Sequence, residues 1–478
     1  MTIRDKLNAD PGFNYVIDSM ELMSSTGRRF LMQQPLLTDA LLLEKEYSNI
    51  DRVKAVLTEE CHQQSVSTLL HQLMQMHDLH GTLLNLQHHM TLEEIELFEI
   101  KSFAFLCMTA ARASKDMGID DILSIPDLHE VFNILDPDRT NIPSFYIYDS
   151  YHPDLPDIRR QLKAKQTLLE KSESKTEESA TIQQQINSLF EQHNAIQHQV
   201  IVRLSDNLQS FHSTLQEALK QMAYADLLFA KATLAKEWNL CHPHLTTLEL
   251  GKTCYRSLWN PRLKSHNEEI GLRYQPVDIE LSKGVCLITG ANMAGKTVLL
   301  KTVGISQLMA QFGFFVPAAE ATVALVDDII LCIGDGQNEM NGLSSYASEI
   351  IKISDTIRRA DNEKLLILID EPARTTNPIE GKAIVQSVAK LLDKRNSATL
   401  ITTHYSQLEL NCRRLRVKGF VESMSDSPLT PENINSFMDY SLLPDESEEV
   451  PQEALRIASI LGCDSRLLDT ATEFLQRQ

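Results

Sequence analysis

The chain has 478 residues, of which 43% are hydrophobic and 23% charged, a composition typical of a globular protein large enough for more than one core. Its formal net charge of −20 argues against a general nucleic-acid coat, which should be basic, but leaves room for a local basic face. The N-terminus carries no apolar signal segment, no apolar run reaches the roughly 18 residues of a membrane span, and the eight cysteines are scattered singly, so we expect a cytoplasmic protein with reduced thiols and no membrane contact.

The sequence pattern of the first half of the chain predicts helices. Only four of the 17 glycines precede residue 250, and none lies between Gly118 and Gly251. From Ile182 to Met222 apolar residues recur at steps of three or four, which predicts one face of a long helix or helical hairpin. That stripe would pack in a helical bundle or, alternatively, form a dimerising coiled coil. We therefore expect residues 1–250 to form a mostly α-helical domain.

Two stretches interrupt this helical pattern. Residues 135–160 are rich in prolines and aromatics and predict a strand or an extended crossover between helical blocks. Residues 171–181 are polar and offer nothing to a core, which is typical of a hairpin tip or a solvated helical turn.

Beyond Gly251 the pattern changes to short apolar, β-branched runs that alternate with helical segments. The strand-like runs are 284–290, 321–334, 364–372 and 397–405, and the helical patterns are 297–311, 347–360 and 381–394. Such alternation predicts a mostly parallel sheet covered by helices. Sheets of this kind bind ligands at the carboxyl ends of their strands. We expect residues 251–478 to form an α/β domain that closes with a helical segment.

A phosphate-binding loop follows the first of these runs. Residues 290–297, GANMAGKT, match the pattern G-x-x-x-x-G-K-[ST] in full, between an apolar strand and a helix. Its glycines let backbone N–H groups turn toward phosphates, Lys296 would meet the β- and γ-phosphates, and the Thr297 hydroxyl would bind Mg²⁺. The domain is therefore predicted to be a P-loop NTPase. The expected nucleotide-binding residues are Gly290, Ala291, Asn292, Met293, Ala294, Gly295, Lys296, Thr297 and Val298.

An acidic pair ends a later apolar run. Asp370 and Glu371 directly follow the four apolar residues 366–369. We expect Asp370 to hold Mg²⁺ together with Thr297, and Glu371 to orient or deprotonate the attacking water. His404 lies near the end of the run 397–405 and is expected to reach the γ-phosphate and sense its loss. With Lys296, these residues predict an ATP hydrolase.

The order and wording of these motifs resemble the MutS family of ATPases. The segments that carry the resemblance are TGANMAGKT (289–297), GFFVPA (313–318), IGDGQNEMNGLSSYASE (333–349), LIDEPARTTNPIEG (368–381), TTHYSQL (402–408) and ALRIASILGCDSRLLDTA (454–471). Fainter matches at 23–36 and 224–245 resemble the start and the close of that family's core-and-lever domain.

The resemblance implies an ABC-type ATPase domain preceded by helical levers, which works as a homodimer or as a heterodimer with a related ATPase. It implies that ATP binding closes the two ATPase faces and that hydrolysis reopens them. Ser344 corresponds to the serine that reaches across the dimer to the partner's γ-phosphate, and Tyr274 stands where the family places an aromatic that stacks on adenine. Ordinary packing is the competing interpretation of Tyr274.

Departures from the family pattern bear on the link to DNA. The sequence begins near the core domain, so we expect the mismatch-reading and connector domains to be absent, and the polar segment 171–181 is too short for a DNA clamp. The paired aspartates of the signature segment are Gln337 and Asn338 here, and the arginine before its serine is Leu343.

Two functions follow from this pattern. The first is a DNA-acting protein of the mismatch-repair or recombination type, with Arg28, Arg29, Arg159 and Arg160 as candidate phosphate contacts. The alternative is a protein-remodelling ATPase with a protein client, such as a reactivase of a cobalamin-dependent aminomutase.

Overall fold

The computed structural model forms two compact units. It describes residues 1–7, 11–171, 177–291, 294–333, 345–374, 376–405, 408–421, 437–445, 455, 458 and 462–476. The first unit comprises Met1–Met20, Gln33–Ile50 and Thr233–Gln478, and the second comprises Glu21–Met32 and Asp51–Ala232. The N-terminal segments thus group with the predicted ATPase domain, a division that differs from the single boundary at residue 250.

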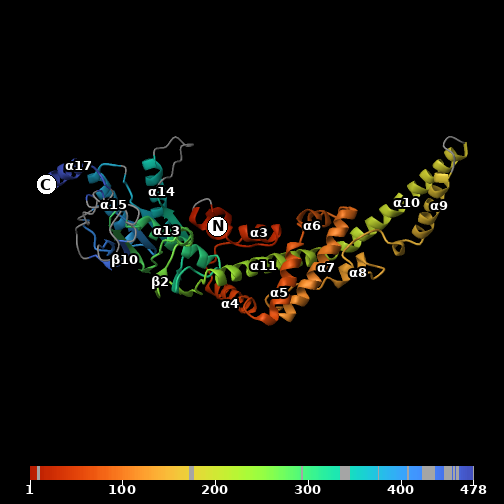
Figure 1. The fold of residues 1–478 in the computed structure, drawn as a ribbon, viewed down its shortest axis with the longest axis horizontal. Coiled ribbons are helices and arrows are strands. Elements are labelled where there is room, and N and C mark those ends of the chain that lie inside the picture. The colour runs from red at the N-terminus through yellow and green to blue at the C-terminus, as the bar shows by residue number, and fades with distance from the viewer. Residues whose placement is uncertain are drawn as a thin grey trace. The chain divides into compact units, whose positions relative to one another are not determined.

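The second unit is built from helices. Its elements are α3 (Ser25–Met32), η1 (Glu60–His62), α5 (Gln63–Met74), α6 (His80–Gln87), α7 (Glu94–Asp116), α8 (His129–Leu135), η2 (Asp149–Tyr151), α9 (Leu155–Lys171) and α10 (Glu177–Gln209), with parts of α4 (Ala40–Val56) and α11 (His212–Glu237) (Figure 1). Residues 135–160 contain η2 and extended backbone but no strand, so the crossover interpretation is confirmed and the strand alternative is wrong. The physical reason is that side chains, rather than a neighbouring strand, bond backbone carbonyls of this segment: Lys101 bonds Ser144, Arg159 bonds Ile147 and Arg203 bonds Tyr151.

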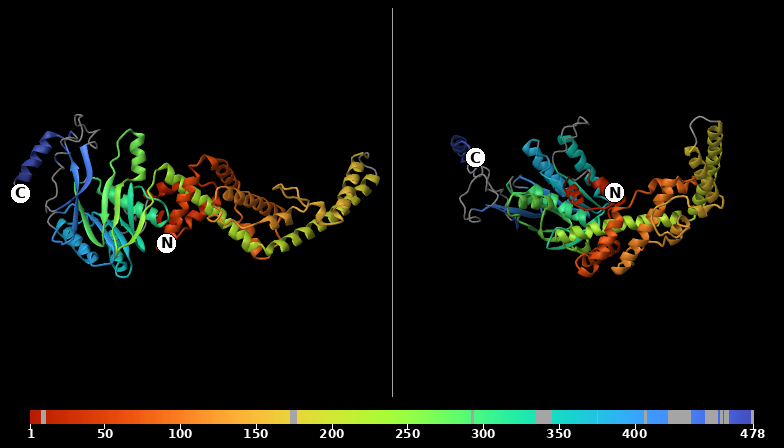
Figure 2. Two further views of the ribbon diagram at one scale, coloured as in Figure 1. Left: turned by 90° about the horizontal axis from the view of Figure 1, so that it is seen from below. Right: turned by 45° about the vertical axis from the view of Figure 1, so that its right-hand side comes forward.

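Helices α9 and α10 pack together as a hairpin, drawn in yellow in Figure 2. Ile158, Leu162 and Ile186 are buried between them, and further members of the predicted stripe pack around these three. Later members, including Val200 and Leu204, are also buried within the chain. The apolar stripe therefore forms intramolecular packing, as the bundle interpretation predicts.

A six-stranded sheet forms the centre of the first unit. Its order is β10 (Met438–Pro444), β9 (Arg413–Phe420), β4 (Gly284–Thr289), β8 (Ala398–Thr402), β7 (Leu365–Asp370) and β6 (Asp328–Cys332). All neighbours are parallel except β10, which is antiparallel to β9. Ile288 of β4 lies opposite Thr402 of β8, and Thr402 lies opposite Asp370 of β7. The register therefore brings the ends of three strands to the same level.

Helices cover both faces of this sheet because its strands are apolar on both sides. On one face, α13 (Lys296–Gln311) packs so closely that a Cβ on Gly304 would lie 3.1 Å from Leu368 and 3.2 Å from Leu331. On the other face, Ile367 and Ile369 share a core with α14 (Ser345–Arg359) and α15 (Pro378–Asp393). The predicted helix-covered parallel sheet is therefore present.

A second sheet of four strands lies in the same unit. Its order is β1 (His244–Thr247), β5 (Glu320–Leu325), β2 (Thr253–Leu258) and β3 (Val277–Leu281). The run at 321–334, expected as one strand, is split into β5 and β6, which belong to different sheets. The side chain of Gln311 bonds both the carbonyl and the N–H of Val326 at the break, so these groups leave the strand ladder. Within the described residues, this unit also contains the helices α1 (Ile3–Leu7), α2 (Pro11–Asp18), α12 (Pro261–Glu269) and α17 (Ser465–Gln476).

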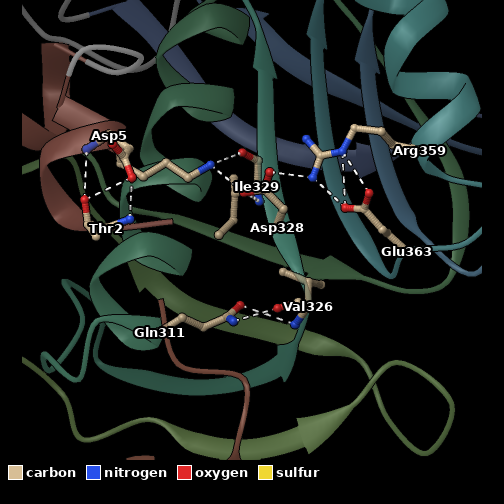
Figure 3. A network of polar contacts seen from close by, with 9 residues as sticks. Thr2, Asp5, Gln311, Val326, Asp328, Ile329, Arg359 and Glu363 are labelled. Atoms are coloured by element: carbon tan, nitrogen blue, oxygen red, sulfur yellow. Dashed lines mark hydrogen bonds and ion pairs between the residues drawn. The ribbon is translucent and has the colours of Figure 1, made fainter. Parts of the chain in front are cut away.

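A buried ion pair fastens the N-terminal helix to the six-stranded sheet. Lys6 Nζ donates to Asp328 Oδ1 at 2.5 Å and to the carbonyl of Ile329 at 2.7 Å, and both charged side chains are almost fully buried. Asp328 Oδ2 accepts a further bond from Arg359 at the end of α14, which also pairs with Glu363 (Figure 3). This network explains why residues 1–7 group with the sheet.

Across the parts of the chain that the structure describes, no helix combines the length and the apolar character needed to cross a bilayer.

Candidate nucleotide site

The described parts of the loop between β4 and α13 have the glycine backbone angles expected of a phosphate cradle. Gly290 has φ 144° and Gly295 has φ 74°, values that residues with a Cβ rarely adopt. A Cβ at Gly295 would also lie 3.1 Å from the ring of Tyr440. The helix α13 begins at the next residue, Lys296, so its first N–H groups border the loop.

Asn292 and Met293, both expected to bind nucleotide, lie outside the described residues. Ala291 and Ala294 belong to the described part of the loop, and the N–H of Ala294 bonds the carbonyl of Ala291 at 3.0 Å. Val298 follows in the first turn of α13 with 36% of its surface exposed.

Lys296 is buried against its own loop. Its Nζ donates to the carbonyl oxygens of Gly290 at 2.7 Å and Ala291 at 3.0 Å, and lies 3.4 Å from Glu371 Oε1. Only 4% of the residue is exposed. A buried ammonium group requires acceptors, and here the loop carbonyls and one carboxylate supply them.

Asp370 lies between two hydroxyl groups. Thr297 Oγ1 donates to its Oδ2 and Thr402 Oγ1 donates to its Oδ1, each at 2.6 Å. Carboxylate and hydroxyl oxygens are the ligands that Mg²⁺ prefers in proteins, and Asp370 and Thr297 present them side by side at the start of α13. The donor set therefore fits Mg²⁺.

Glu371 faces two cationic or titratable side chains. Its Oε1 lies 3.4 Å from Lys296 Nζ, and its Oε2 lies 3.9 Å from His404 Nδ1. Its backbone N–H is held by Thr402, through the carbonyl at 3.2 Å and the hydroxyl at 2.9 Å. Lys296, Glu371 and His404 thus meet at one edge of the sheet, and Thr402 links them to Asp370.

A pocket of about 690 Å³ opens beside the loop. Gly295 and Val298 line it on the side of α13, and the rings of Tyr274 and Tyr440 line it elsewhere. The Tyr274 hydroxyl accepts a hydrogen bond from the N–H of Asn260 at 2.9 Å, which fixes the ring. Burial raises the pKa of both tyrosines, so both hydroxyls stay neutral. The pocket has the size and the aromatic lining that a nucleotide base requires.

The structure brings together most of the site residues expected from sequence. Lys296, Thr297, Asp370, Glu371 and His404 gather at the carboxyl ends of β4, β7 and β8. Tyr274 lies in the adjoining pocket. Ser344, expected to act in trans, lies outside the described residues, and α14 begins at Ser345.

Two further residues of the site were not singled out in the sequence. Thr402 lies within the TTHY segment, where two hydroxyl residues at the end of an apolar strand gave a usable signal. Tyr440 belongs to β10, and no motif in its own stretch indicated that it reaches the loop.

Comparison with known proteins places this site in a family. Residues 286–477 match the family model described as MutS domain V. Over 304 residues, 62% of this chain and 36% of the relative, the chain is 30% identical to the "Endonuclease MutS2" of Caldicellulosiruptor saccharolyticus. It is 28% identical over 316 residues to the "DNA mismatch repair protein MutS" of Syntrophomonas wolfei, covering 65% of this chain and 36% of that protein. It is 36% identical over 214 residues, 44% of this chain, to the "Endonuclease MutS2" of Lactobacillus acidophilus, covering 26% of that protein.

The matched regions therefore span only about a third of the length of these relatives, or less. The family-model match, residues 286–477, includes the phosphate-binding loop, the Asp370–Glu371 pair and His404.

Proposed function

We propose that this chain, which belongs to the MutS family of ATPases, hydrolyses ATP to ADP and phosphate and uses the reaction to control its association with DNA. The observation that supports the enzymatic part is the meeting of Lys296, Glu371 and the Asp370–Thr297 pair at one sheet edge. Phosphoryl transfer depends on positioning and on charge stabilisation, and these groups offer both.

The loop and its lysine would bind the phosphates. Lys296 exchanges the carbonyls of Gly290 and Ala291 for phosphate oxygens, which attract an ammonium group more strongly because they are charged. The N-terminus of α13 adds the positive end of its dipole. Asp370 and Thr297 would hold Mg²⁺, which when bound would neutralise part of the phosphate charge.

Glu371 would serve as the base. Once Lys296 turns to phosphate, the Glu371 carboxylate is available to a water molecule. The water oxygen attacks the γ-phosphorus, the bond from that phosphorus to the β–γ bridging oxygen breaks, ADP leaves with the electron pair, and the water proton passes to Glu371. His404, whose Nδ1 lies 3.9 Å from Glu371 Oε2, would contact the γ-phosphate. The adenine ring of ATP would occupy the pocket lined by Tyr274 and Tyr440.

The catalytic part is tested by Glu371→Gln. This change keeps the size of the side chain but removes its basicity, so we expect ATP to bind with unchanged affinity while kcat falls about 10²- to 10⁴-fold. Native turnover by Glu371→Gln would overturn the assignment of the base.

The active form is proposed to be a dimer in which Ser344 of one subunit completes the site of the other. The Ser344 and Lys296 variants give a direct test because each should be inactive alone. In a mixed dimer of Ser344→Ala with Lys296→Ala, the site that keeps Lys296 receives an intact Ser344 from its partner. Mixing should therefore restore activity. If two inactive variants stay inactive although they form mixed dimers, the arrangement in trans is wrong.

The DNA part is supported by the relatives, which are named for mismatch repair and for endonuclease activity. Three arginines considered as phosphate contacts are ion-paired: Arg29 with Asp78, Arg159 with Asp149 and Arg160 with Asp157. DNA would therefore have to compete with these carboxylates.

The DNA hypothesis is tested with fluorescent duplex, mismatched and branched DNA at two salt concentrations, with and without ATP, in the wild type and in Glu371→Gln. We expect ATP to change the affinity and the variant to hold the ATP-bound response for longer. If no DNA binds in a manner that depends on ATP, the DNA part fails while the ATPase part stands.

A further inference from the structure

The turn that follows Glu371 has an unusual backbone. Glu371 has φ 45° and Ala373 has φ 61°, so two residues with side chains adopt the left-handed region on either side of Pro372. This conformation is disfavoured for residues with a Cβ and persists only where the surroundings impose it. The question is which groups impose it here.

One end of the turn is fixed by Thr402, which accepts the Glu371 N–H. The other end is fixed by two side chains from outside the turn. Glu349 Oε1 accepts the Ala373 N–H at 3.3 Å, and the Tyr405 hydroxyl donates to the Ala373 carbonyl at 3.2 Å. Ala373 is fully buried, so these bonds replace water for both of its backbone groups.

A glycine makes room for the tyrosine. A Cβ on Gly381 of α15 would lie 2.1 Å from the Tyr405 hydroxyl oxygen and 3.2 Å from the Ala373 carbonyl oxygen. Any side chain at position 381 would therefore push the hydroxyl away from its acceptor. The bond from Tyr405 to Ala373 depends on the absence of that side chain.

Glu349 comes from the first turns of α14, the helix that begins directly after Ser344. Burial raises the pKa of the Glu349 carboxyl, while the Ala373 N–H and nearby Arg374 act in the opposite direction. The hydrogen bond from the Ala373 N–H and the charge of Arg374 thus offset part of the cost of half-burying this carboxyl group.

We propose that Glu349 and Tyr405 are positioning residues that hold the turn 371–373 and so aim the Glu371 carboxylate at the phosphate loop. The proposal rests on the proposed ATPase function, in which Glu371 is the base. The turn is only three residues long, so a release of Ala373 lets the backbone relax toward a favoured region and moves the carboxylate with it. A small displacement of a reacting group lowers the rate of a chemical step without weakening the binding of substrate.

The test compares kcat and ATP affinity in four variants. We expect Glu349→Ala to lower kcat about 10- to 100-fold and to leave the affinity for ATP within about twofold. Glu349→Gln keeps an oxygen acceptor and should retain kcat within about threefold. Tyr405→Phe removes only the hydroxyl and should lower kcat about fivefold. Gly381→Ala should resemble Tyr405→Phe.

Asp355→Asn is the matched control, because it removes an exposed carboxylate from the same helix, where it pairs with Arg358. It should leave kcat unchanged. If Glu349→Gln is as slow as Glu349→Ala, or if Asp355→Asn is equally slow, the positioning role is overturned.

The double variant Glu349→Ala with Glu371→Gln tests the positioning role of Glu349 separately from the role of Glu371 as the general base. If Glu349 acts through Glu371, Glu349→Ala should cause no further loss of rate when Glu371 is already Gln. A full additional loss would show that Glu349 acts elsewhere and would overturn the positioning role. The kcat of the single variant Glu371→Gln tests the function itself. Native turnover by this variant would overturn the assignment of Glu371 as the general base.

Discussion

Each unit of the molecule contains a buried lysine beside a carboxylate, and the two lysines differ in how their partners are arranged. Lys101 of the helical unit is fully buried and donates to Asp136 at 3.0 Å, to the Ser144 carbonyl at 2.9 Å and to the Tyr148 hydroxyl at 2.8 Å. Lys296 of the ATPase unit donates to two carbonyls of its own loop and lies 3.4 Å from Glu371.

The difference lies in what each lysine holds together. The partners of Lys101 lie 35 to 47 residues away in sequence, and its ammonium group also faces the rings of Phe132 and Tyr148. The carbonyl partners of Lys296 lie five and six residues away. We therefore expect that exchange of Lys296's partners for phosphate would cost the fold little, whereas loss of the Lys101 contacts would release the crossover that follows α8. Burial and charge alone therefore do not distinguish a structural lysine from one that binds a ligand.

The strongest test of this contrast is Lys101→Met. The change leaves Asp136 buried beside an apolar side chain, so we expect the helical unit to lose about 3–5 kcal/mol of stability. Hydrogen exchange of α7 and of residues 136–148, together with urea unfolding, measures the loss. Lys115→Met, an exposed position on the same helix, is the control and should have almost no effect. Equal destabilisation by both variants would contradict a special role for Lys101.

Lys296→Ala is the matching change in the ATPase unit. Removal of one partner of a buried charge pair costs about 2–5 kcal/mol, and here we expect that loss in ATP affinity rather than in folding. Titration calorimetry measures the affinity, and thermal unfolding without nucleotide measures the stability. Lys301→Ala, exposed on the same helix α13, should bind ATP normally. A folding defect in Lys296→Ala larger than its loss of affinity would remove the distinction between the two lysines.

Acid should weaken the helical unit through Asp136. Burial acts to raise the pKa of this carboxyl, but hydrogen bonds from Thr140, the Asn141 N–H and Lys101 outweigh it and lower the pKa from 3.8 to about 2. Because the folded pKa lies below the unfolded one, the carboxylate's contribution to stability is complete above about pH 4 and is lost as the pH falls toward 2.

This loss should be smaller than that in Lys101→Met, since protonation leaves the other bonds of the network in place. Unfolding free energies measured between pH 5 and 2 report it. The Asp136→Asn variant should lack that part of the pH dependence, and an unchanged acid profile in the variant would assign the effect to other carboxyls.

The parts of the site that sequence predicted are those encoded by local patterns. The loop at Gly290–Thr297 and the Asp370–Glu371 pair each follow an apolar strand, and parallel strands present their carboxyl ends at one edge. The motifs and the strand pattern alone therefore predicted that the loop and the acidic pair lie close together at one edge of the sheet. The mostly parallel sheet followed from the same alternation.

The parts that sequence did not predict depend on which elements become neighbours. Tyr440 reaches Gly295 because β10 pairs with β9 and β9 pairs with β4, an order that no single segment encodes. Glu349 and Tyr405 meet at Ala373 from a helix and from the end of a strand. The break between β5 and β6 is set by the side chain of Gln311, which lies on another element.

Substitutions of the two pocket tyrosines should have the smallest effect. They extend the comparison from the side of the site that would bind phosphates to the side that would bind adenine. Stacking on a base contributes about 0.5–1.5 kcal/mol, so Tyr274→Ala and Tyr440→Ala should each weaken ATP binding about 2- to 10-fold. Inorganic triphosphate has no base, so its affinity should be unchanged in both variants but reduced in Lys296→Ala. Tyr274→Phe keeps the ring and loses only the bond from Asn260, so it should bind ATP nearly normally. If Tyr440→Ala weakens ATP and triphosphate equally, its ring supports the Gly295 turn instead of the base, as its contact with that glycine also permits.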